Sequence, residues 1–299
     1  MKIITETEID LNDVEHLIDL ALEEDIKDGD LTTEYLIAED KKVTAFMKAK
    51  ADGVLSGIFI AEKIFKKLDA NINWNPKFND GDKIKNGDTI VEFSGSYRAI
   101  LTGERTALNF LQRMSGVATK TNEFVKAIEG TKSQILDTRK TLPTYRMIDK
   151  YSVKMGGGTN HRIGLFDMVM IKDNHIKVAG GITNAVNKIR ASVDSNIRIE
   201  VETSNMAEVE EAVNCNVDII MLDNMNNNEM KNAVDFIGGR ALVEASGNVN
   251  LERVKSIAET GVDFISIGAL THSAIALDIG QYILDWFDAR LSVNLHLKK

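Results

Sequence analysis

The sequence predicts an α/β protein, in which an N-terminal α/β sandwich domain precedes a C-terminal parallel βα barrel shortened to about six strands. From about residue 133 onward, short apolar segments alternate with amphipathic ones, which is typical of parallel strands joined by helical crossovers. The first ~115 residues instead alternate polar and apolar positions between Gly-Asp turns, as antiparallel strands do. The two patterns indicate two domains.

The strands of the second domain are predicted from apolar runs rich in Val and Ile, because strands covered on both faces have this composition. They span residues 134–138, 168–172, 197–203, 218–224, 241–246 and 264–270. Amphipathic helices are predicted between them at residues 182–192, 206–213, 227–237 and 251–260. Since these strands are fewer than those of the common barrel, we expect a shortened or partly open one.

The first domain combines helices with short strands. An apolar stripe predicts a helix over residues 11–25, and alternation predicts a half-exposed strand over residues 42–50. Gly-Asp turns divide residues 78–95 into short antiparallel strands. A long periodic segment without proline, residues 105–129, is expected to form a helix that links the two domains.

The tail of the chain contains the segment IALDIGQYILDWFDAR, which predicts a helix that packs back on the first domain. We therefore expect three parts. They are the sandwich domain over residues 1–115, the barrel domain over residues 116–272 and the helical tail over residues 273–299.

Composition limits the possible partners. The formal net charge is -9 and the isoelectric point is near 5.2, which argues against general nucleic-acid binding, since that requires a basic face. Cys215 is the single cysteine, so no intrachain disulfide can form and a reducing compartment is expected. The first residues lack the apolar core of a signal peptide, and no apolar run is long enough to span a bilayer. These features predict a cytoplasmic protein without a membrane partner.

Polar side chains follow the predicted strands, at the ends where βα barrels carry their working residues. Basic residues follow the first two strands, acidic residues lie on the next two, and glycine-containing turns close the last two. In chain order they are Thr138, Arg139 and Lys140; Lys172; Glu200 and Glu202; Asp223; Ser246, Gly247 and Asn248; and Gly268 and Ala269. The segment GGGTNHR, residues 156–162, adds His161 and Arg162 to the basic group. One polar strand end could arise by chance, whereas so many in register favour an active site.

Several of these residues also have a plainer structural interpretation. Lys172 alone could be a solvated strand end, and residues 156–158 could form an ordinary glycine turn. Glu200 and Glu202 share one face of their strand. They could form an exposed stripe, or they could point into the barrel or toward the helices, where burial without a partner would be costly.

The residue types indicate the chemistry of the ligand. A guanidinium fork matches a carboxylate, so Arg139 and Arg162 suit an acidic small molecule. The turns at residues 246–248 and 268–269 offer backbone N–H groups to a phosphate. Carboxylates can hold Mg²⁺ together with waters and substrate phosphates. No P-loop or dinucleotide fingerprint is present, which weakens kinase and dehydrogenase interpretations.

Longer blocks of sequence carry a resemblance over nearly the whole chain. In the barrel part they are DTRKTLP, GGGTNHRIGLFDMVMIKDNH, IEVET, MLDN, EASGN and ISIGALTHS, and before it EDIKDGDLTT and GERTALNFLQRMSGVAT. These blocks, in this order, closely resemble the quinolinate phosphoribosyltransferase family, also called nicotinate-nucleotide pyrophosphorylase (carboxylating). Thr144 departs from the family pattern, which usually has glycine there, and this puts the local turn in question.

The resemblance implies an enzyme that converts quinolinate and phosphoribosyl pyrophosphate to nicotinate mononucleotide, pyrophosphate and CO₂ in NAD biosynthesis, with Mg²⁺ as cofactor. It also implies a homodimer in which Arg105 reaches the substrate bound to the partner subunit. The implied quinolinate-binding residues are Arg105, Thr138, Arg139, Lys140, His161, Arg162 and Lys172, and the implied phosphate-binding residues are Ser246, Gly247, Asn248, Ile267, Gly268 and Ala269. The implied catalytic residues are Lys140, Lys172, Glu202 and Asp223, of which the two acidic ones would also hold Mg²⁺, with Glu200 as the alternative to Glu202.

Two other hypotheses stay open. One is a related barrel enzyme of the same superfamily that acts on another pyridine or acidic substrate, including a molybdenum-associated paralogue. The other is a barrel without catalytic activity that binds a phosphorylated metabolite as a sensor or scaffold. The full set of basic residues favours a dicarboxylate, and the scaffold hypothesis leaves Glu202 and Asp223 without a role.

Overall fold

The computed structural model describes residues 11–284, which divide into two compact units. One unit, here the barrel unit, contains Thr121–Arg146 and Gly157–Ser273. The other, here the sandwich unit, contains the described residues up to Lys120, the segment Met147–Gly156 and the described residues from Ala274 onward. Each unit is described by itself.

The barrel unit is built on a parallel sheet of six strands, as the sequence predicts. The strands are β6 (Gln134–Leu136), β7 (Val169–Ile171), β8 (Ile199–Thr203), β9 (Ile219–Asp223), β10 (Leu242–Ser246) and β11 (Phe264–Ser266). Their order, β6-β11-β10-β9-β8-β7, runs in a ring that is open between β6 and β7. Thr159 forms a parallel bridge with Leu136, so the segment before His161 lies along the open edge of β6.

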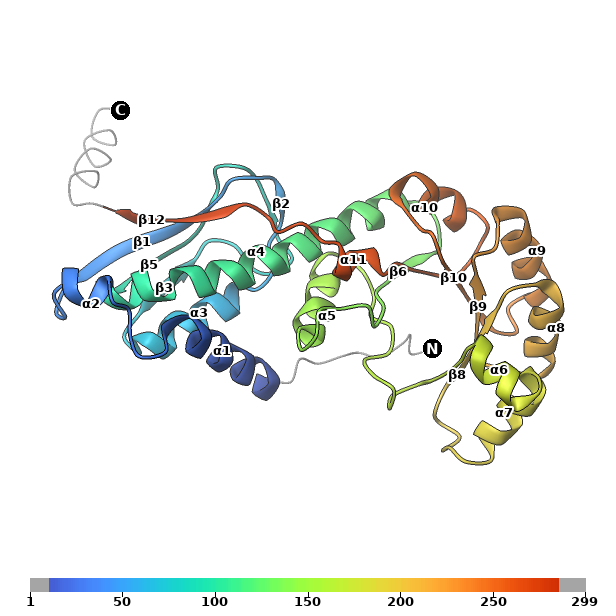
Figure 1. Ribbon diagram of the computed structural model, residues 1–299. Coiled ribbons are helices and arrows are strands. Elements are labelled where there is room, and N and C mark those ends of the chain that lie inside the picture. The colour runs from blue at the N-terminus through green and yellow to red at the C-terminus, as the bar shows by residue number, and fades with distance from the viewer. Residues whose placement is uncertain (1–10, 285–299) are drawn as a thin grey trace. The chain divides into compact units, whose positions relative to one another are not determined.

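Helices form the outer layer of this unit, and consecutive members of the α7–α10 series contact each other (Figure 1). The helices are α6 (Asp173–Ala179), α7 (Ile182–Arg190), α8 (Met206–Asn214), α9 (Asn227–Ile237), α10 (Leu251–Ala258) and α11 (Ala269–His272). The side chains of Asn205, Asn226 and Asn250 cap three of them by accepting hydrogen bonds from backbone N–H groups of the first turn. The helices α6 and α11 were not predicted, and α11 begins where the last strand was expected to continue.

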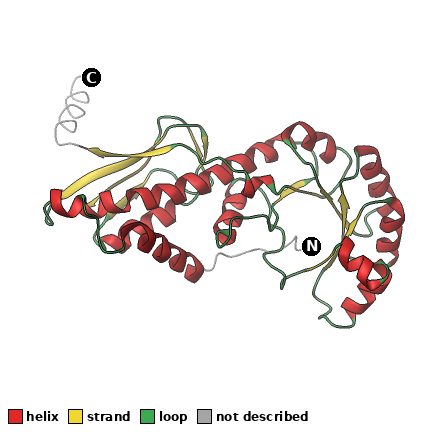
Figure 2. Cartoon of the chain, in the orientation of Figure 1, coloured by secondary structure: helices red, strands yellow, loops and turns green. Residues whose placement is uncertain are grey.

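The sandwich unit contains a four-stranded antiparallel sheet of order β12-β1-β5-β3 (Figure 2). These strands are β1 (Lys42–Ala49), β3 (Asn73–Pro76), β5 (Thr89–Ser96) and β12 (Ile279–Leu284). Two short strands, β2 (Gly53–Val54) and β4 (Lys83–Ile84), form a second antiparallel pair.

Helices accompany this sheet and complete an α/β sandwich. They are α1 (Leu11–Ile26), α2 (Thr33–Leu36), α3 (Ile58–Leu68), α4 (Tyr97–Ala127) and α5 (Arg146–Met155). Phe65 of α3 packs on the sheet, with its ring centroid 4.8 Å from that of Phe93 and 5.9 Å from that of Trp74. The long helix α4 begins at Tyr97, eight residues before the predicted start at Arg105.

The prediction of a helical tail is wrong for the part that the structure describes. Residues Ile279–Leu284 form strand β12, which pairs antiparallel with β1 from Thr44↔Leu284 to Ala49↔Ile279. The edge of β1 offers unpaired backbone groups, and pairing with them outweighs the weak helical periodicity of so short a segment. The tail thus returns to the first sheet as a strand, and residues 285–299 lie outside the described residues.

Candidate active site

The carboxyl ends of the barrel strands carry most of the predicted site residues. Thr138, Arg139 and Lys140 follow β6, Lys172 follows β7, Glu202 lies near the end of β8, Asp223 ends β9, and Ser246 ends β10. The turn at residues 267–269 follows β11. Arg105 is different, because it is an exposed residue of α4 in the sandwich unit. Its predicted contact with substrate stays a prediction.

Acidic and basic side chains meet at the ends of β7, β8 and β9. The Lys172 Nζ lies 2.9 Å from the Glu202 Oε2, and Glu202 and Asp223 line one pocket, whose wall also includes Thr203 and Ser204. The Lys172 backbone N–H donates to His175 Nδ1 at 3.0 Å, which fixes the start of α6. The pocket is also lined by Asp173, Lys177 and Glu208, and Lys172 pairs with Glu202 beside it.

The turn after β10 has an unusual backbone. Gly247 and Asn248 have positive φ angles of 95° and 52°, and Asn224 in the turn after β9 has one of 55°. Asn248 Nδ2 donates to Asn224 Oδ1 at 3.0 Å, which joins the two turns. A Cβ atom on Gly247 would lie 2.2 Å from that same Asn224 oxygen, so only glycine fits. Concave turns of this kind direct backbone N–H groups at anions.

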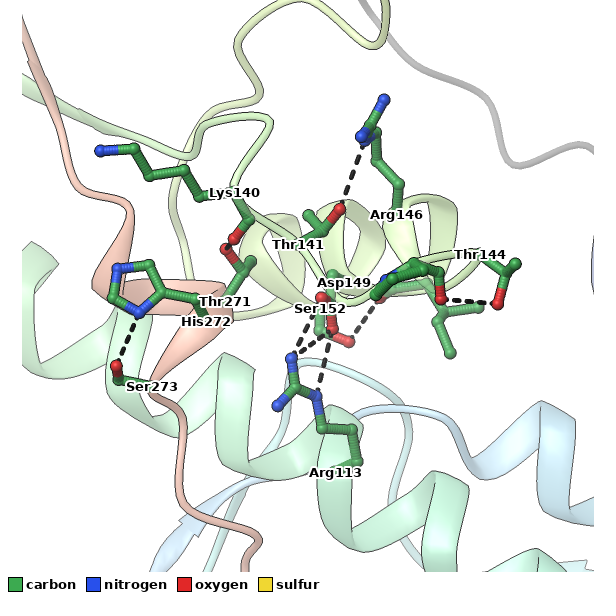
Figure 3. A network of polar contacts seen from close by, with 12 residues as sticks. Arg113, Lys140, Thr141, Thr144, Arg146, Asp149, Ser152, Thr271, His272 and Ser273 are labelled. Carbon is green, nitrogen blue, oxygen red and sulfur yellow. Dashed lines mark hydrogen bonds and ion pairs between the residues drawn. The ribbon is translucent and has the colours of Figure 1, made fainter.

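The turn after β11 supports Lys140. A Cβ atom on Gly268 would lie 2.8 Å from Lys140 Cδ and 3.2 Å from His272 Cδ2, so the lysine stem crosses the glycine backbone. The Thr271 hydroxyl donates to the Lys140 carbonyl oxygen at 2.8 Å (Figure 3). The Lys140 backbone N–H donates to Thr138 Oγ1 at 3.0 Å. These contacts hold the backbone of Lys140 and leave its exposed ammonium group without an ion pair among residues 11–284.

Two arginines, Arg139 and Arg162, lie close enough for their charges to affect each other. Burial lowers the pKa of Arg162, and the positive charge of Arg139 lowers it further. Arg162 donates to the Met168 carbonyl oxygen at 2.9 Å, whereas the Nε of Arg139 is buried and has no hydrogen-bond partner in the described part of the chain. Among residues 11–284 neither guanidinium forms an ion pair. Two adjacent cations with free donors are suited to a ligand that carries more than one negative charge.

A second polar cluster lies deeper in the barrel. His161 Nε2 is 3.0 Å from Glu200 Oε2 and 3.3 Å from Glu244 Oε2, and all three side chains are buried. Burial lowers the pKa of His161 and opposes the charges of Glu244 and Glu200, which raise it, while Nδ1 accepts the Arg162 backbone N–H at 2.7 Å and therefore carries no proton. Burial and the charge of Glu244 raise the pKa of Glu200 to about 7. The exposed-stripe interpretation of Glu200 is therefore wrong, because its side chain lies inside the barrel.

This deep cluster does not require a metal ion. His161, Glu200 and Glu244 are close enough to share one. However, the carboxylates already face a ring N–H, and the charge of Arg162 also acts on Glu200. The pocket at Glu202 and Asp223 is the better candidate for Mg²⁺, because its carboxylates are open to solvent and Mg²⁺ keeps several waters when bound.

Sequence analysis missed Asp137 and Glu244. Asp137 is fully buried and accepts hydrogen bonds from Asn160 Nδ2 at 2.6 Å and from the His161 backbone N–H at 2.8 Å. Glu244 stands in the middle of the apolar run ALVEAS, and a carboxylate at such a position is itself a signal, because its burial requires a partner.

In the part of the chain that the structure describes, no helix has the length and apolar character needed to cross a membrane.

Family models match both parts of the chain. The family described as Quinolinate phosphoribosyl transferase, C-terminal domain, matches residues 117–281, and the corresponding N-terminal domain family matches residues 30–115. A Nicotiana tabacum protein named quinolinate phosphoribosyltransferase [decarboxylating] 1b is 45% identical over 290 residues, which cover 91% of this chain and 82% of the relative. A Bacillus subtilis protein named probable nicotinate-nucleotide pyrophosphorylase [carboxylating] is 41% identical over 258 residues, which cover 86% of this chain and 89% of the relative.

Solved structures show the same fold over both units. A structure of NadC from Streptococcus pyogenes superimposes with a TM-score of 0.89 at 38% identity, covering 94% of this chain and all of the other. The nicotinate-nucleotide pyrophosphorylase of Francisella tularensis gives a TM-score of 0.87 at 42% identity, covering 93% of this chain and 98% of the other. Matches of this extent, together with the strand-end residues described above, show that the chain belongs to the quinolinate phosphoribosyltransferase family.

Proposed function

We propose that this protein is a decarboxylating phosphoribosyltransferase that converts quinolinate and phosphoribosyl pyrophosphate to nicotinate mononucleotide, pyrophosphate and CO₂. The observation that carries the proposal is the pair Arg139 and Arg162, two neighbouring guanidinium groups without an ion-pair partner among residues 11–284. Quinolinate is a dianion at neutral pH. Two fixed cations would offset the cost of removing it from water and would orient its ring.

Lys140 and Lys172 complete the basic side of the proposed pocket. Lys140 has a fixed backbone and an ammonium group that forms no ion pair within residues 11–284, whereas Lys172 is paired with Glu202 at 2.9 Å. A dicarboxylate would draw both ammonium groups toward the two arginines. This arrangement favours quinolinate over a monocarboxylate such as nicotinate, because the second carboxylate also finds a cation.

Glu202 and Asp223 are the proposed catalytic carboxylates. Positive charge develops at C1 of the ribose as pyrophosphate leaves and the quinolinate nitrogen forms its bond to that carbon, and negative side chains beside it stabilise this charge. The same carboxylates would hold Mg²⁺, which when bound would neutralise charge on the pyrophosphate. The positive-φ turn at residues 246–248 would bind the 5′-phosphate through backbone N–H groups, together with residues 267–269.

Loss of CO₂ follows bond formation to the ribose. The quaternised ring accepts the electron pair of the carbon–carboxylate bond next to nitrogen, and the resulting ring carbon then takes up a proton. Exclusion of water would protect that carbon until the proton arrives.

We propose that a homodimer closes the site and that Arg105 of one subunit reaches the substrate of the other. Arg105→Ala should then remove activity without unfolding the protein, and activity should return in mixtures with Lys140→Ala subunits. A mixture that stays inactive would count against the shared site.

The experiment that tests the function uses purified protein with quinolinate, phosphoribosyl pyrophosphate and Mg²⁺, and measures CO₂ and nicotinate mononucleotide together. A parallel reaction contains nicotinate in place of quinolinate. Equal amounts of both products from quinolinate alone would support the proposal, and omission of Mg²⁺ would test the metal. Binding of both substrates without turnover would favour the scaffold hypothesis.

A cytoplasmic location stays a prediction, since relatives from Oryza sativa and Nicotiana tabacum are named as chloroplastic and mitochondrial proteins.

A further inference from the structure

The buried cluster of His161, Glu200 and Glu244 lies one layer deeper in the barrel than Glu202. Glu200 and Glu244 belong to β8 and β10, alternate strands of the sheet, and alternate strands contribute side chains to the same interior layer. Both carboxylates are fully buried, and apart from the His161 contacts their oxygens have no hydrogen-bond partner among residues 11–284. Burial of a carboxylate without partners destabilises a folded protein, so the placement of two of them against one histidine ring needs an explanation.

Both nitrogens of the His161 ring are used by the protein. The backbone N–H of Arg162 donates to Nδ1 at 2.7 Å, so the ring proton is on Nε2. Nε2 faces the two carboxylates, at 3.0 Å from Glu200 and 3.3 Å from Glu244. In this geometry no ring nitrogen is left to bind a substrate.

The same contacts fix the segment that carries Arg162. Asp137 accepts hydrogen bonds from the Asn160 side chain and from the His161 backbone N–H, so the barrel holds this segment on one side. The His161 ring holds it on the other side through the Arg162 backbone N–H. The direction of the Arg162 side chain is then set by its hydrogen bond to the Met168 carbonyl oxygen at 2.9 Å.

We infer that His161 is a positioning residue rather than a substrate ligand, and that Glu200 and Glu244 act through its ring to hold Arg162 in place for a carboxylate-bearing substrate. The identity of that substrate rests on the proposed function, whereas the ring geometry does not. The inference replaces the expectation that the His161 ring contacts quinolinate directly. It also gives the two buried carboxylates a role apart from Glu202 and Asp223.

The first test observes the ring itself in protein with ¹⁵N-labelled histidine, by long-range ¹H–¹⁵N spectroscopy. The signals are assigned by their loss in His161→Gln, or by elimination among the five histidines if that variant does not fold. We expect Nε2 to carry a proton that exchanges slowly and Nδ1 to carry none, with both unchanged when quinolinate is added. A proton on Nδ1, or a change in Nε2 on addition of quinolinate, would overturn the inference. Because no turnover is needed, this test stands even if the proposed function fails.

The second test separates positioning from general loosening of the barrel. Glu244→Gln keeps the shape of the side chain and removes its charge, and loss of such a supporting partner typically costs about tenfold or more in affinity. We expect KM for quinolinate to rise about tenfold, with KM for phosphoribosyl pyrophosphate within about twofold of wild type. Glu200→Gln should behave alike. Combination of either change with His161→Gln should add little, since all act through one ring.

Ser133→Ala is the matched control. Ser133 is buried just before β6, at the other end of that strand from Thr138, and donates to the Val262 carbonyl oxygen at 2.7 Å. Its loss should lower the melting temperature without changing either KM. Equal increases of both KM values in Glu244→Gln, or an increase of KM for quinolinate in Ser133→Ala, would overturn the positioning role. Absence of turnover in the wild-type protein would instead refute the proposed function.

Discussion

Gly247→Ala is the sharpest perturbation of the proposed phosphate turn. Gly247 has a φ of 95°, and a Cβ atom there would lie 2.2 Å from Asn224 Oδ1 and 3.1 Å from the Asn224 backbone nitrogen. A left-handed conformation costs an alanine about 1–2 kcal/mol. Displacement of the Asn224 side chain would also break its 3.0 Å hydrogen bond with Asn248, a loss of about 1 kcal/mol.

Gly239→Ala is the matched control for backbone strain. Gly239 also has a positive φ, 79°, but no atom lies within 4 Å of the position of its Cβ. Both substitutions reduce the freedom of the unfolded chain equally, so that effect cancels. The difference in unfolding free energy between the two variants therefore reports the clash with Asn224. We expect Gly247→Ala to be the less stable by about 1–2 kcal/mol in urea unfolding.

The effect of Gly247→Ala on ligands should be selective. A hydrogen bond to a charged group contributes about 1.5–3 kcal/mol, so loss of one N–H contact should weaken phosphoribosyl pyrophosphate binding roughly 10- to 100-fold. Quinolinate affinity should stay within about twofold, because its proposed cations lie on other strand ends. Titration calorimetry with each ligand measures both values. Unchanged affinity for phosphoribosyl pyrophosphate, or equal losses for both ligands, would refute the assignment of this turn to phosphate.

Three further predictions concern other parts of the chain. Lys172→Met should raise KM for quinolinate about tenfold, with a stability change within about 1 kcal/mol because the ion pair is partly exposed. Lys231→Met, which removes an exposed ion pair on α9, should leave kinetics unchanged. Thr144→Gly should raise the melting temperature by roughly 1–3 °C, since Thr144 has a φ of 66° that strains a β-branched residue; a decrease would contradict this. Burial raises the pKa of Asp80, so the folded protein favours the neutral carboxyl group. The stability that Asp80 contributes is therefore present at low pH and is lost as the pH rises through the pKa of Asp80 in the folded protein. Asp80→Asn should therefore destabilise most near about pH 4 and least near about pH 8 in urea titrations, and the opposite trend would contradict the burial effect.

The parallel strands were predictable because their physical requirement is simple. A strand covered on both faces must be apolar throughout, and this composition is visible in a single sequence, as in residues 218–224. The strand β12 was not predictable in the same way. Its residues, Ile279–Leu284, include Gly280 and Gln281 and lack a clear period, and their state is decided by the free edge of β1, more than 200 residues away in the chain.

The turn at Thr144 shows how a local departure can be interpreted physically. The family usually has glycine at this position, and the structure places Thr144 in the left-handed region that glycine tolerates best. The threonine hydroxyl hydrogen-bonds the Pro143 carbonyl oxygen at 2.6 Å, which offsets part of the strain. The departure from the family pattern therefore pointed to this turn, whereas its left-handed backbone and the compensating hydrogen bond required the structure.

The two glutamates of β8 show why roles are harder to predict than positions. A period of two places Glu200 and Glu202 on one face of the strand, but they differ in depth by roughly 6–7 Å along it. That depth decides the partner: Lys172 near the strand end for Glu202, and His161 inside the barrel for Glu200. The depth of each glutamate in the barrel depends on the residue at which the strand ends. Strand ends are the least certain feature of a sequence prediction, because assigned boundaries commonly differ by one or two residues. A shift of two residues would exchange the roles of the two carboxylates, so the choice between them depends on the boundary at Thr203 and not on the pattern of the strand.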